Sequence, residues 1–152
     1  GDTVFMSDIP IRRVVEEIPK ISDRSIGTCL CARDEQPYAW FGTDGMYIRK
    51  SYFRGKDGNV GSGIHDQSLF YFKGNLLLDG LERYRQFLQI EEKQNLSDFG
   101  NTISEMKMLY AFEYFHDIGR PMEYCMTEPG QVMSFNTKEE LENIEQFVTV
   151  EE

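Results

Sequence analysis

The sequence is poor in cysteine and histidine, the residues that build disulfide frameworks and most transition-metal sites. It contains three cysteines, Cys29, Cys31 and Cys125, and two histidines, His65 and His116. A small, odd number of cysteines does not make a disulfide framework, which slightly favours a reducing cytoplasm. In a secreted protein, either Cys29 or Cys31 could instead bridge to Cys125. Because only two histidines are present, any histidine-based site must use His65, His116 or both.

Basic residues and long apolar runs are also scarce. The chain has 16 Lys and Arg against 26 Asp and Glu, which gives a net charge of −10. A phosphate backbone repels this negative field, so general nucleic-acid binding is disfavoured. No apolar run approaches the roughly 20 residues of a membrane-spanning helix, so no membrane partner is expected. An acidic surface of this kind suits a protein that meets another, basic protein.

Apolar and aromatic residues, in contrast, are abundant enough to build a core. Apolar residues make up 40% of the chain, and the aromatic residues are 11 Phe, 8 Tyr and 1 Trp. The length of 152 residues suits one domain and is too short for two comfortable ones. We therefore expect residues 1–152 to form a single globular domain, with aromatic rings left over for a binding surface.

Periodicity and turn residues predict the elements of the first half of the chain. Apolar residues recur at helical spacing between Asp8, which can cap a helix, and Pro19, which can end it. Alternating residues and tight-turn dipeptides then predict strands. The predicted elements are a helix within 7–20, a strand at 25–33, a hairpin within 38–53 around Asp44-Gly45, and a hairpin within 68–78 around Gly74-Asn75.

The second half of the chain is predicted to be mainly helical, because capping residues precede three apolar-periodic segments. The fold class is therefore α+β: a mostly antiparallel sheet of about six strands, flanked by an N-terminal helix, two central helices and a C-terminal helix. The predicted elements are a helix after Asp79, a helix opened by Thr102 and Glu105, strands at 122–127 and 131–135 around Pro129-Gly130, and a helix opened by Thr137 and Glu140.

The segment YFHDIGRP (114–121) places His116 and Asp117 at the end of a predicted helix, before Ile-Gly and a basic residue. It resembles the signature of the HD-domain metal-dependent phosphohydrolases, in which adjacent His and Asp face a divalent metal. The resemblance implies that His116 and Asp117 bind a metal that activates water for attack on a phosphoester. It also implies a helical fold, and a further His and Asp as ligands.

Helix termination is a second interpretation of the same residues. A cation in the last turn, a glycine just beyond it and a proline soon after are typical of helix ends. His116, Gly119 and Pro121 supply these three features. Asp117 does not fit, because a carboxylate at a helix C-terminus opposes the helix dipole by about 0.3–1 kcal/mol. The other histidine, His65, precedes a predicted strand.

A basic, glycine-rich segment at 49–63 is a candidate for phosphate or nucleotide binding. Basic side chains, aromatic rings and the backbone N–H groups of glycines can together hold a phosphate or a base. The glycine spacing, however, matches no phosphate-loop motif, and a solvent-exposed hairpin connection is the commoner explanation of such a segment. The candidate ligand-binding residues are Arg49, Lys50, Tyr52, Arg54 and Lys56.

Two further groups of residues are candidates for a protein interface. Tyr38 and Trp40 share one face of a predicted strand, but alternation alone leaves open whether that face or the opposite one is core. Glutamates on the C-terminal helix would give it an acidic outer face that could dock a basic partner. The acidic candidates are Glu139, Glu142 and Glu145.

Taken together, these patterns favour an acidic, non-enzymatic protein-interaction domain, such as an inhibitor, an immunity-type protein or a regulatory protein. It would act through a charged and aromatic surface, and no cofactor is predicted for it. The alternative is a metal-dependent phosphoester- or nucleotide-handling enzyme that uses the 49–63 segment. Its weak catalytic candidates are His65, Asp66, His116 and Asp117, and only this alternative requires a divalent metal.

Overall fold

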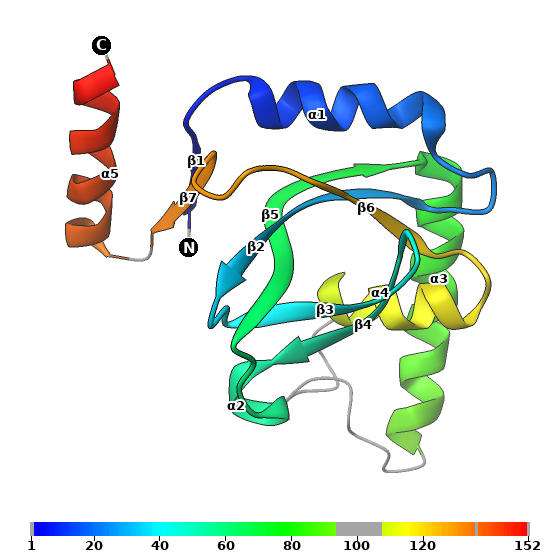
Figure 1. Cartoon of the computed structure of the whole chain (residues 1–152). Coiled ribbons are helices and arrows are strands. Elements are labelled where there is room, and N and C mark those ends of the chain that lie inside the picture. Colours follow the sequence, from blue (N-terminus) through cyan, green and yellow to red (C-terminus); the bar gives the residue numbers. More distant parts are fainter. Residues whose placement is uncertain (1, 94–107, 136, 152) are drawn as a thin grey trace.

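A computed structural model describes residues 2–93, 108–135 and 137–151 of the chain (Figure 1). These residues form seven strands, five α-helices and one 3₁₀ helix, in two sheets. In chain order they are β1 (Asp2–Phe5), α1 (Ile9–Glu17), the 3₁₀ helix η1 (Ile18–Lys20), β2 (Gly27–Glu35), β3 (Ala39–Asp44), β4 (Tyr47–Phe53), α2 (Arg54–Asp57), β5 (Ser62–Phe72), α3 (Gly74–Lys93), α4 (Met108–Asp117), β6 (Met122–Met126), β7 (Val132–Phe135) and α5 (Lys138–Glu151).

The main sheet has five strands in the order β3-β4-β6-β2-β5. All of its pairs are antiparallel except β2 with β6, which run parallel. The predicted α+β fold with a mostly antiparallel sheet is therefore confirmed. The hairpin predicted around Asp44-Gly45 is also confirmed: β3 pairs with β4, and Gly45 has a φ of +60°, which a glycine adopts at no steric cost.

The sheet curls, so that the ends of its two outer strands approach each other. The β2–β5 ladder continues past the end of β2, where the backbone N–H of Gln36 donates to the carbonyl of Gly61 at 2.9 Å. Gly63 of β5 lies directly against Trp40 of β3, because a Cβ placed on Gly63 would be 2.9 Å from the Trp40 Cβ. A glycine is therefore required at position 63 for the close approach of the two strands.

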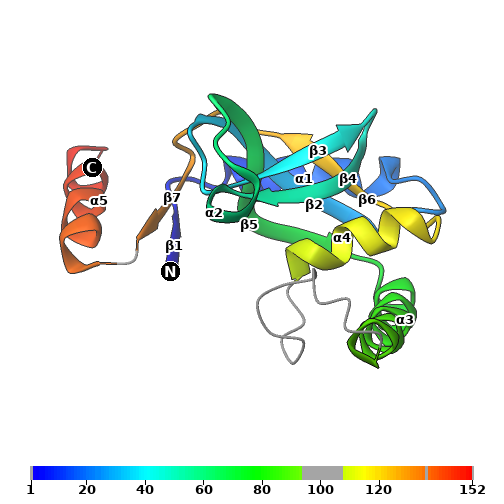
Figure 2. The ribbon, with the colours of Figure 1, turned by 90° about the horizontal axis from the view of Figure 1, so that it is seen from below.

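Helices cover the main sheet on both faces (Figures 1 and 2). On one face, Val14 of α1 packs with Leu30 and Cys125. On the other face, Cys29 and Cys31 pack among the aromatic residues of α3 and α4. Both faces of β2 are consequently core, and the run from residue 27 to residue 32 is buried throughout. Within the described residues, no helix is long and apolar enough to cross a membrane.

The hairpin predicted around Gly74-Asn75 is wrong. β5 continues as one strand to Phe72, and α3 begins at Gly74, so Asp79 lies inside a helix instead of capping one. The helix replaces the second strand because Leu76 and Leu77 pack against the core from it. Gly74 and Asn75, which are typical turn residues, are the first two residues of α3. The helix start predicted at Thr102 and Glu105 lies outside the described residues.

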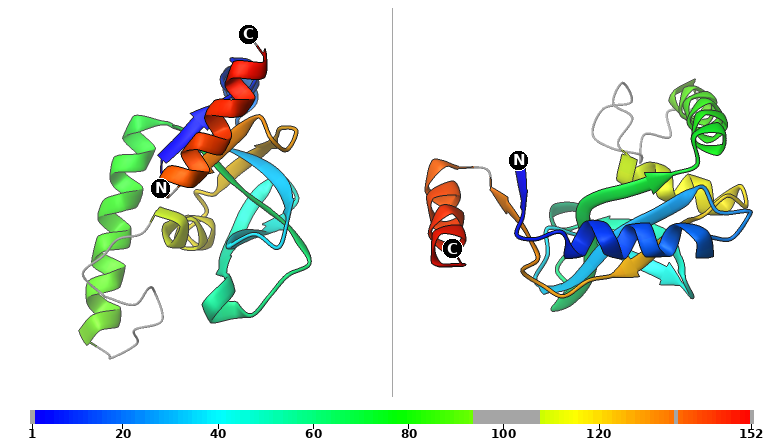
Figure 3. Two further views of the ribbon diagram at one scale, coloured as in Figure 1. Left: turned by 90° about the vertical axis from the view of Figure 1, so that its left-hand side faces the viewer. Right: turned by 90° about the horizontal axis from the view of Figure 1, so that it is seen from above.

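β7 and α5 belong to a second, smaller unit that includes a strand the sequence did not predict. β1 pairs with β7 in a separate two-stranded sheet. α5 begins with the predicted capping box, in which the Thr137 N–H donates to Glu140 Oε2 at 3.2 Å and the Glu140 N–H donates to Thr137 Oγ1 at 3.1 Å. The main contacts of α5 are with β7, and the helix stands beyond it, away from the main sheet (Figure 3). We call β1, β7 and α5 together the arm.

Candidate functional site

The His-Asp segment ends α4 with the hydrogen bonds of a Schellman motif. The Arg120 N–H donates to the Phe115 carbonyl at 2.9 Å, and the Gly119 N–H donates to the His116 carbonyl at 3.1 Å. Gly119 has a φ of +78°, the left-handed conformation that this motif needs after the helix. The residues that resemble a metal motif therefore terminate a helix, as the second interpretation predicts. Asp117 is the last residue of α4.

The His116 imidazole lies between two carboxylates. Its Nε2 is 3.3 Å from Asp44 Oδ2, at the turn of the β3–β4 hairpin, and its Nδ1 is 3.8 Å from Asp117 Oδ1. The two carboxylates are 65% and 70% exposed, whereas the imidazole is only 23% exposed. When protonated, His116 can therefore bridge the end of α4 to the hairpin turn.

The other histidine has different partners on different strands. His65 of β5 pairs through Nε2 with the Asp34 carboxylate of β2, and Gln67 Nε2 lies 3.4 Å from the same ring nitrogen. The neighbouring Asp66 carboxylate accepts from the Ser68 N–H at 3.1 Å and so supports a β-bulge at Ser68, whose φ is +58°, where the β2–β5 register shifts.

The donor set that the HD-domain resemblance implies does not fit this structure. Among the described residues, no group of three or more His, Cys, Asp and Glu side chains is placed to hold a metal ion. Each histidine instead has its own carboxylate partner. The mostly antiparallel α+β fold also differs from the helical fold that the resemblance implies.

The candidate phosphate-binding residues divide between a strand and a short helix. Arg49, Lys50 and Tyr52 lie on β4, while Arg54 and Lys56 lie on α2. Several of these side chains already have partners in the protein. Lys50 Nζ is 5.5 Å from the Tyr52 ring centroid and 4.0 Å from Glu113 Oε1. Lys56 Nζ is 5.5 Å from the centroid of the Tyr110 ring. The segment therefore presents basic side chains beside aromatic rings.

The aromatic candidates lie at the β3–β4 hairpin with different partners. Tyr38, just before β3, is 6.4 Å from Phe53, whose ring packs against Tyr110 of α4. Trp40 and Tyr52 stack with their ring centroids 5.7 Å apart and an angle of 13° between the rings. Phe41, the neighbour of Trp40, is only 7% exposed and packs against Phe112, so its face of the strand is core. Trp40 therefore lies on the opposite face of the strand from the core, which alternation alone left open. Tyr38 is 72% exposed and is available to a partner.

The three acidic candidates share one exposed helix. Glu139, Glu142 and Glu145 are all exposed on α5, and Glu142 pairs with Lys138 at 3.8 Å, one turn away. Ile144 is only 3% exposed, which fixes the rotation of the helix about its axis. At about 100° per residue, Glu139 and Glu142 lie on the side opposite Ile144, and Glu145 flanks them.

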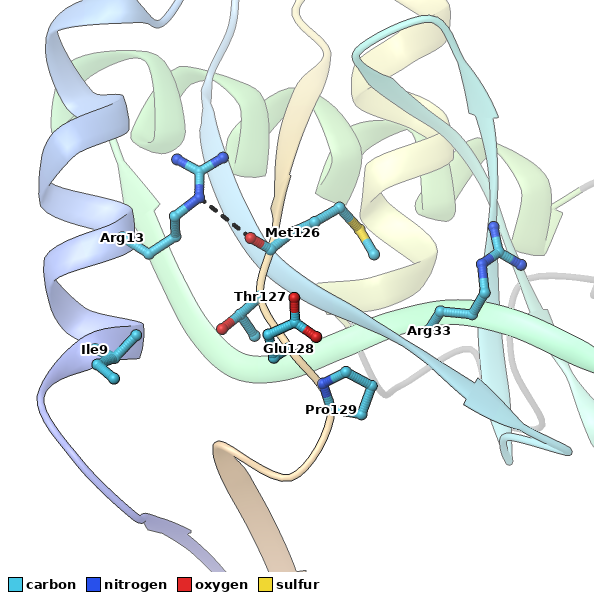
Figure 4. A pocket seen from close by; sticks show the side chains of 7 residues that line it. All are labelled: Ile9, Arg13, Arg33, Met126, Thr127, Glu128 and Pro129. Carbon is cyan, nitrogen blue, oxygen red and sulfur yellow. Dashed lines mark hydrogen bonds between the residues drawn. The ribbon is translucent and has the colours of Figure 1, made fainter.

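An open depression of about 460 Å³ lies where the arm joins the rest of the protein (Figure 4). Arg13 is held at its side, since its Nε donates to the Met126 carbonyl at 3.2 Å and its guanidinium pairs with Glu17. Sequence reasoning missed this depression because its residues come from distant segments that no spacing connects. They are Ile9 and Arg13 of α1, Arg33 of β2, Met126 of β6, and Thr127, Glu128 and Pro129 of the following segment.

The three cysteines are buried thiols on opposite faces of the sheet. The sulfur atoms of Cys29 and Cys31 lie 3.7 Å apart, in the core beneath α3 and α4. Cys125 packs in the core beneath α1. Burial raises the pKa of the Cys125 thiol, and it raises the pKa of Cys29 well above its usual range. Cys29 and Cys125 are therefore protonated and poorly reactive, and all three cysteines are buried.

Comparison of the chain with protein-family models, with curated proteins and with solved structures gives no match.

Proposed function

We propose that this chain is an acidic, non-enzymatic protein-interaction domain, of the inhibitor, immunity-type or regulatory kind, that presents the arm to a basic partner protein. The observation that carries the proposal is the position of α5. Its main contacts are with β7 alone, it stands off the rest of the molecule (Figure 1), and its glutamates are exposed.

The charge distribution supports a basic partner. The exposed glutamates Glu139, Glu142 and Glu145 follow one side of a helix in a protein whose net charge is −10. Each carboxylate is solvated, so a single ion pair with a partner contributes little. The summed field instead accelerates the encounter with a basic surface and selects against acidic ones. The association should therefore weaken as the salt concentration rises.

The aromatic surface supports a second point of contact. Tyr38 exposes 72% of its surface and lies 6.4 Å, between ring centroids, from Phe53. Trp40, two residues further along the chain, is held by stacking on Tyr52. A rigid aromatic side chain of this kind loses little conformational entropy on binding, which is why tyrosine and tryptophan dominate binding hot spots. The acidic helix would then supply the attraction, and the aromatic residues would supply the buried contact.

The proposal is tested by affinity capture from the source cell at physiological and at high salt, with two matched variants. The first replaces Glu139, Glu142 and Glu145 with glutamine, which keeps their length and their helix propensity. The second makes the same net-charge change on other helices, with Glu16→Gln, Asp79→Asn and Glu82→Gln. We expect wild type and the second variant to retain one basic protein, and the first variant to lose it. Equal retention by both variants contradicts the proposal.

A further inference from the structure

The two-stranded sheet of the arm leaves backbone hydrogen-bonding groups without a partner strand. β1 and β7 pair with each other, and no third strand of the described chain joins them. In an antiparallel pair, every second residue directs its N–H and C=O away from its partner strand. The register therefore identifies which residues carry the outward groups.

The hydrogen bond that continues the ladder fixes this assignment. The Met6 N–H donates to the Gln131 carbonyl at 3.0 Å, so Met6 and Gln131 form a hydrogen-bonded pair. Counting back through the register, Val4 and Met133 form the next such pair. Thr3 and Phe5, on either side of Val4, are not in hydrogen-bonded pairs with β7, so their N–H and C=O groups point outward from the edge of β1.

The edge of β1 is the accessible one of the two. α5 has its main contacts with β7, and β1 lies on the other side of β7 from the helix (Figure 3). One end of the ribbon is anchored, because Phe5 and Val132 pack into the core beneath α1. An isolated two-stranded ribbon is marginally stable in water, and a third strand strengthens it.

We propose that the partner binds by adding an extended, basic segment as a third strand along the outer edge of β1. This inference rests on the proposed function, since it specifies how the acidic arm holds a basic protein. Backbone hydrogen bonds to Thr3 and Phe5 would supply affinity, as they do where peptides extend an exposed sheet edge. A segment at this edge lies about two strand spacings, roughly 10 Å, from β7, with α5 beyond β7, and the negative charge of the whole chain attracts it.

The charge of the arm favours a basic segment over a second copy of this chain. Pairing of β1 with β1 of another copy would bring together two chains that each carry a net charge of −10, and two acidic helices. A lysine-rich strand is instead attracted by that field. Self-association through β1 is therefore the competing outcome in the experiment.

The test uses the whole chain and a synthetic probe of about nine residues, in which lysine alternates with threonine and valine so that it favours an extended strand. The readout is amide hydrogen exchange together with the binding affinity. We expect the probe to slow exchange at Thr3 and Phe5, and a probe with glutamate in place of lysine to have no effect. Thr3→Pro removes an outward N–H without touching a β1–β7 bond, and should weaken binding at least about tenfold. Thr3→Val keeps that N–H and should bind as wild type.

Several results would overturn the inference. In Thr3→Pro, retained exchange protection at Val4 and Met133 would show that the β1–β7 ribbon is intact. If that variant then binds the probe with unchanged affinity, strand addition at β1 is excluded. Absence of binding to the lysine probe has the same consequence, as does a dimer that forms without the probe and dissociates on Thr3→Pro. The glutamine variants of α5 decide the proposed function separately: if they lose the partner while Thr3→Pro retains it, the acidic arm stands and the strand addition fails.

Discussion

The hydroxyl of Tyr84 should make the protein sensitive to alkali. Tyr84 is on α3, only 1% exposed, and packs 5.5 Å, between ring centroids, from Tyr114. Burial, reinforced by Tyr110 and Glu113, raises its pKa from 10 to about 12. The neutral phenol is thus the form that the folded state accommodates.

The sign and the size of the effect follow from this pKa. Because the folded state binds the proton more tightly than the unfolded chain, the contribution is fully present below pH 10 and is lost as the pH rises towards about 12. The loss is about 1.4 kcal/mol at pH 11 and approaches about 2.7 kcal/mol at higher pH, since one pKa unit corresponds to about 1.36 kcal/mol.

The measurement is urea unfolding of wild type and Tyr84→Phe between pH 8 and pH 11, with tyrosinate absorbance recorded in parallel. The two proteins share every other ionisable group, so the difference between the two curves isolates Tyr84. We expect the variant to lose less stability than wild type above pH 10, by about 1.4 kcal/mol at pH 11. Two curves that fall in parallel would show that the Tyr84 phenol ionises freely in the folded state, and would refute the reasoning.

Three further predictions concern the core. Phe115 is fully buried against Gly80 and Tyr84. In urea unfolding, Phe115→Ala should lower the free energy of unfolding by about 3–5 kcal/mol, whereas Leu78→Ala, at an exposed position, should lower it by under about 1 kcal/mol. Gly27→Ala would place a Cβ 1.9 Å from the Tyr71 carbonyl oxygen, so circular dichroism should show that this variant does not fold. Gly61→Ala has open space around its Cβ and should fold as wild type. A folded Gly27→Ala would disprove the close pairing of β2 with β5. The three buried thiols should react with a thiol reagent only as the protein unfolds. Fast reaction in native buffer would contradict their burial and the raised pKa of Cys29 and Cys125.

The features that sequence predicted correctly are those in which a few neighbouring residues determine the backbone. Asp44-Gly45 specifies a turn with a positive φ, Thr137 and Glu140 cap α5 reciprocally, and the end of α4 closes on Gly119. Each of these depends on local hydrogen bonds and on glycine's freedom at φ, so no tertiary information is needed.

The features that sequence missed depend on distant contacts. β5 includes Gly63, Asp66 and Ser68, which weaken strand propensity, and is held as a strand by its long pairing with β2. β1 has only four residues, and its partner β7 lies at the other end of the chain. The depression between Arg13 and Arg33 and the open edge at Thr3 arise from the same long-range arrangement, which no local pattern encodes.

The position of the partner on the arm is the most direct test of the central claim. A photo-reactive benzoylphenylalanine at position 142, on α5, and in a second protein at position 82, on α3, would be irradiated in the source cell, and cross-linked products analysed by mass spectrometry. The account predicts one basic protein cross-linked from position 142, absent from position 82, and reduced at high salt. Cross-linking of the same proteins from both positions, or of an acidic protein from position 142, would contradict it.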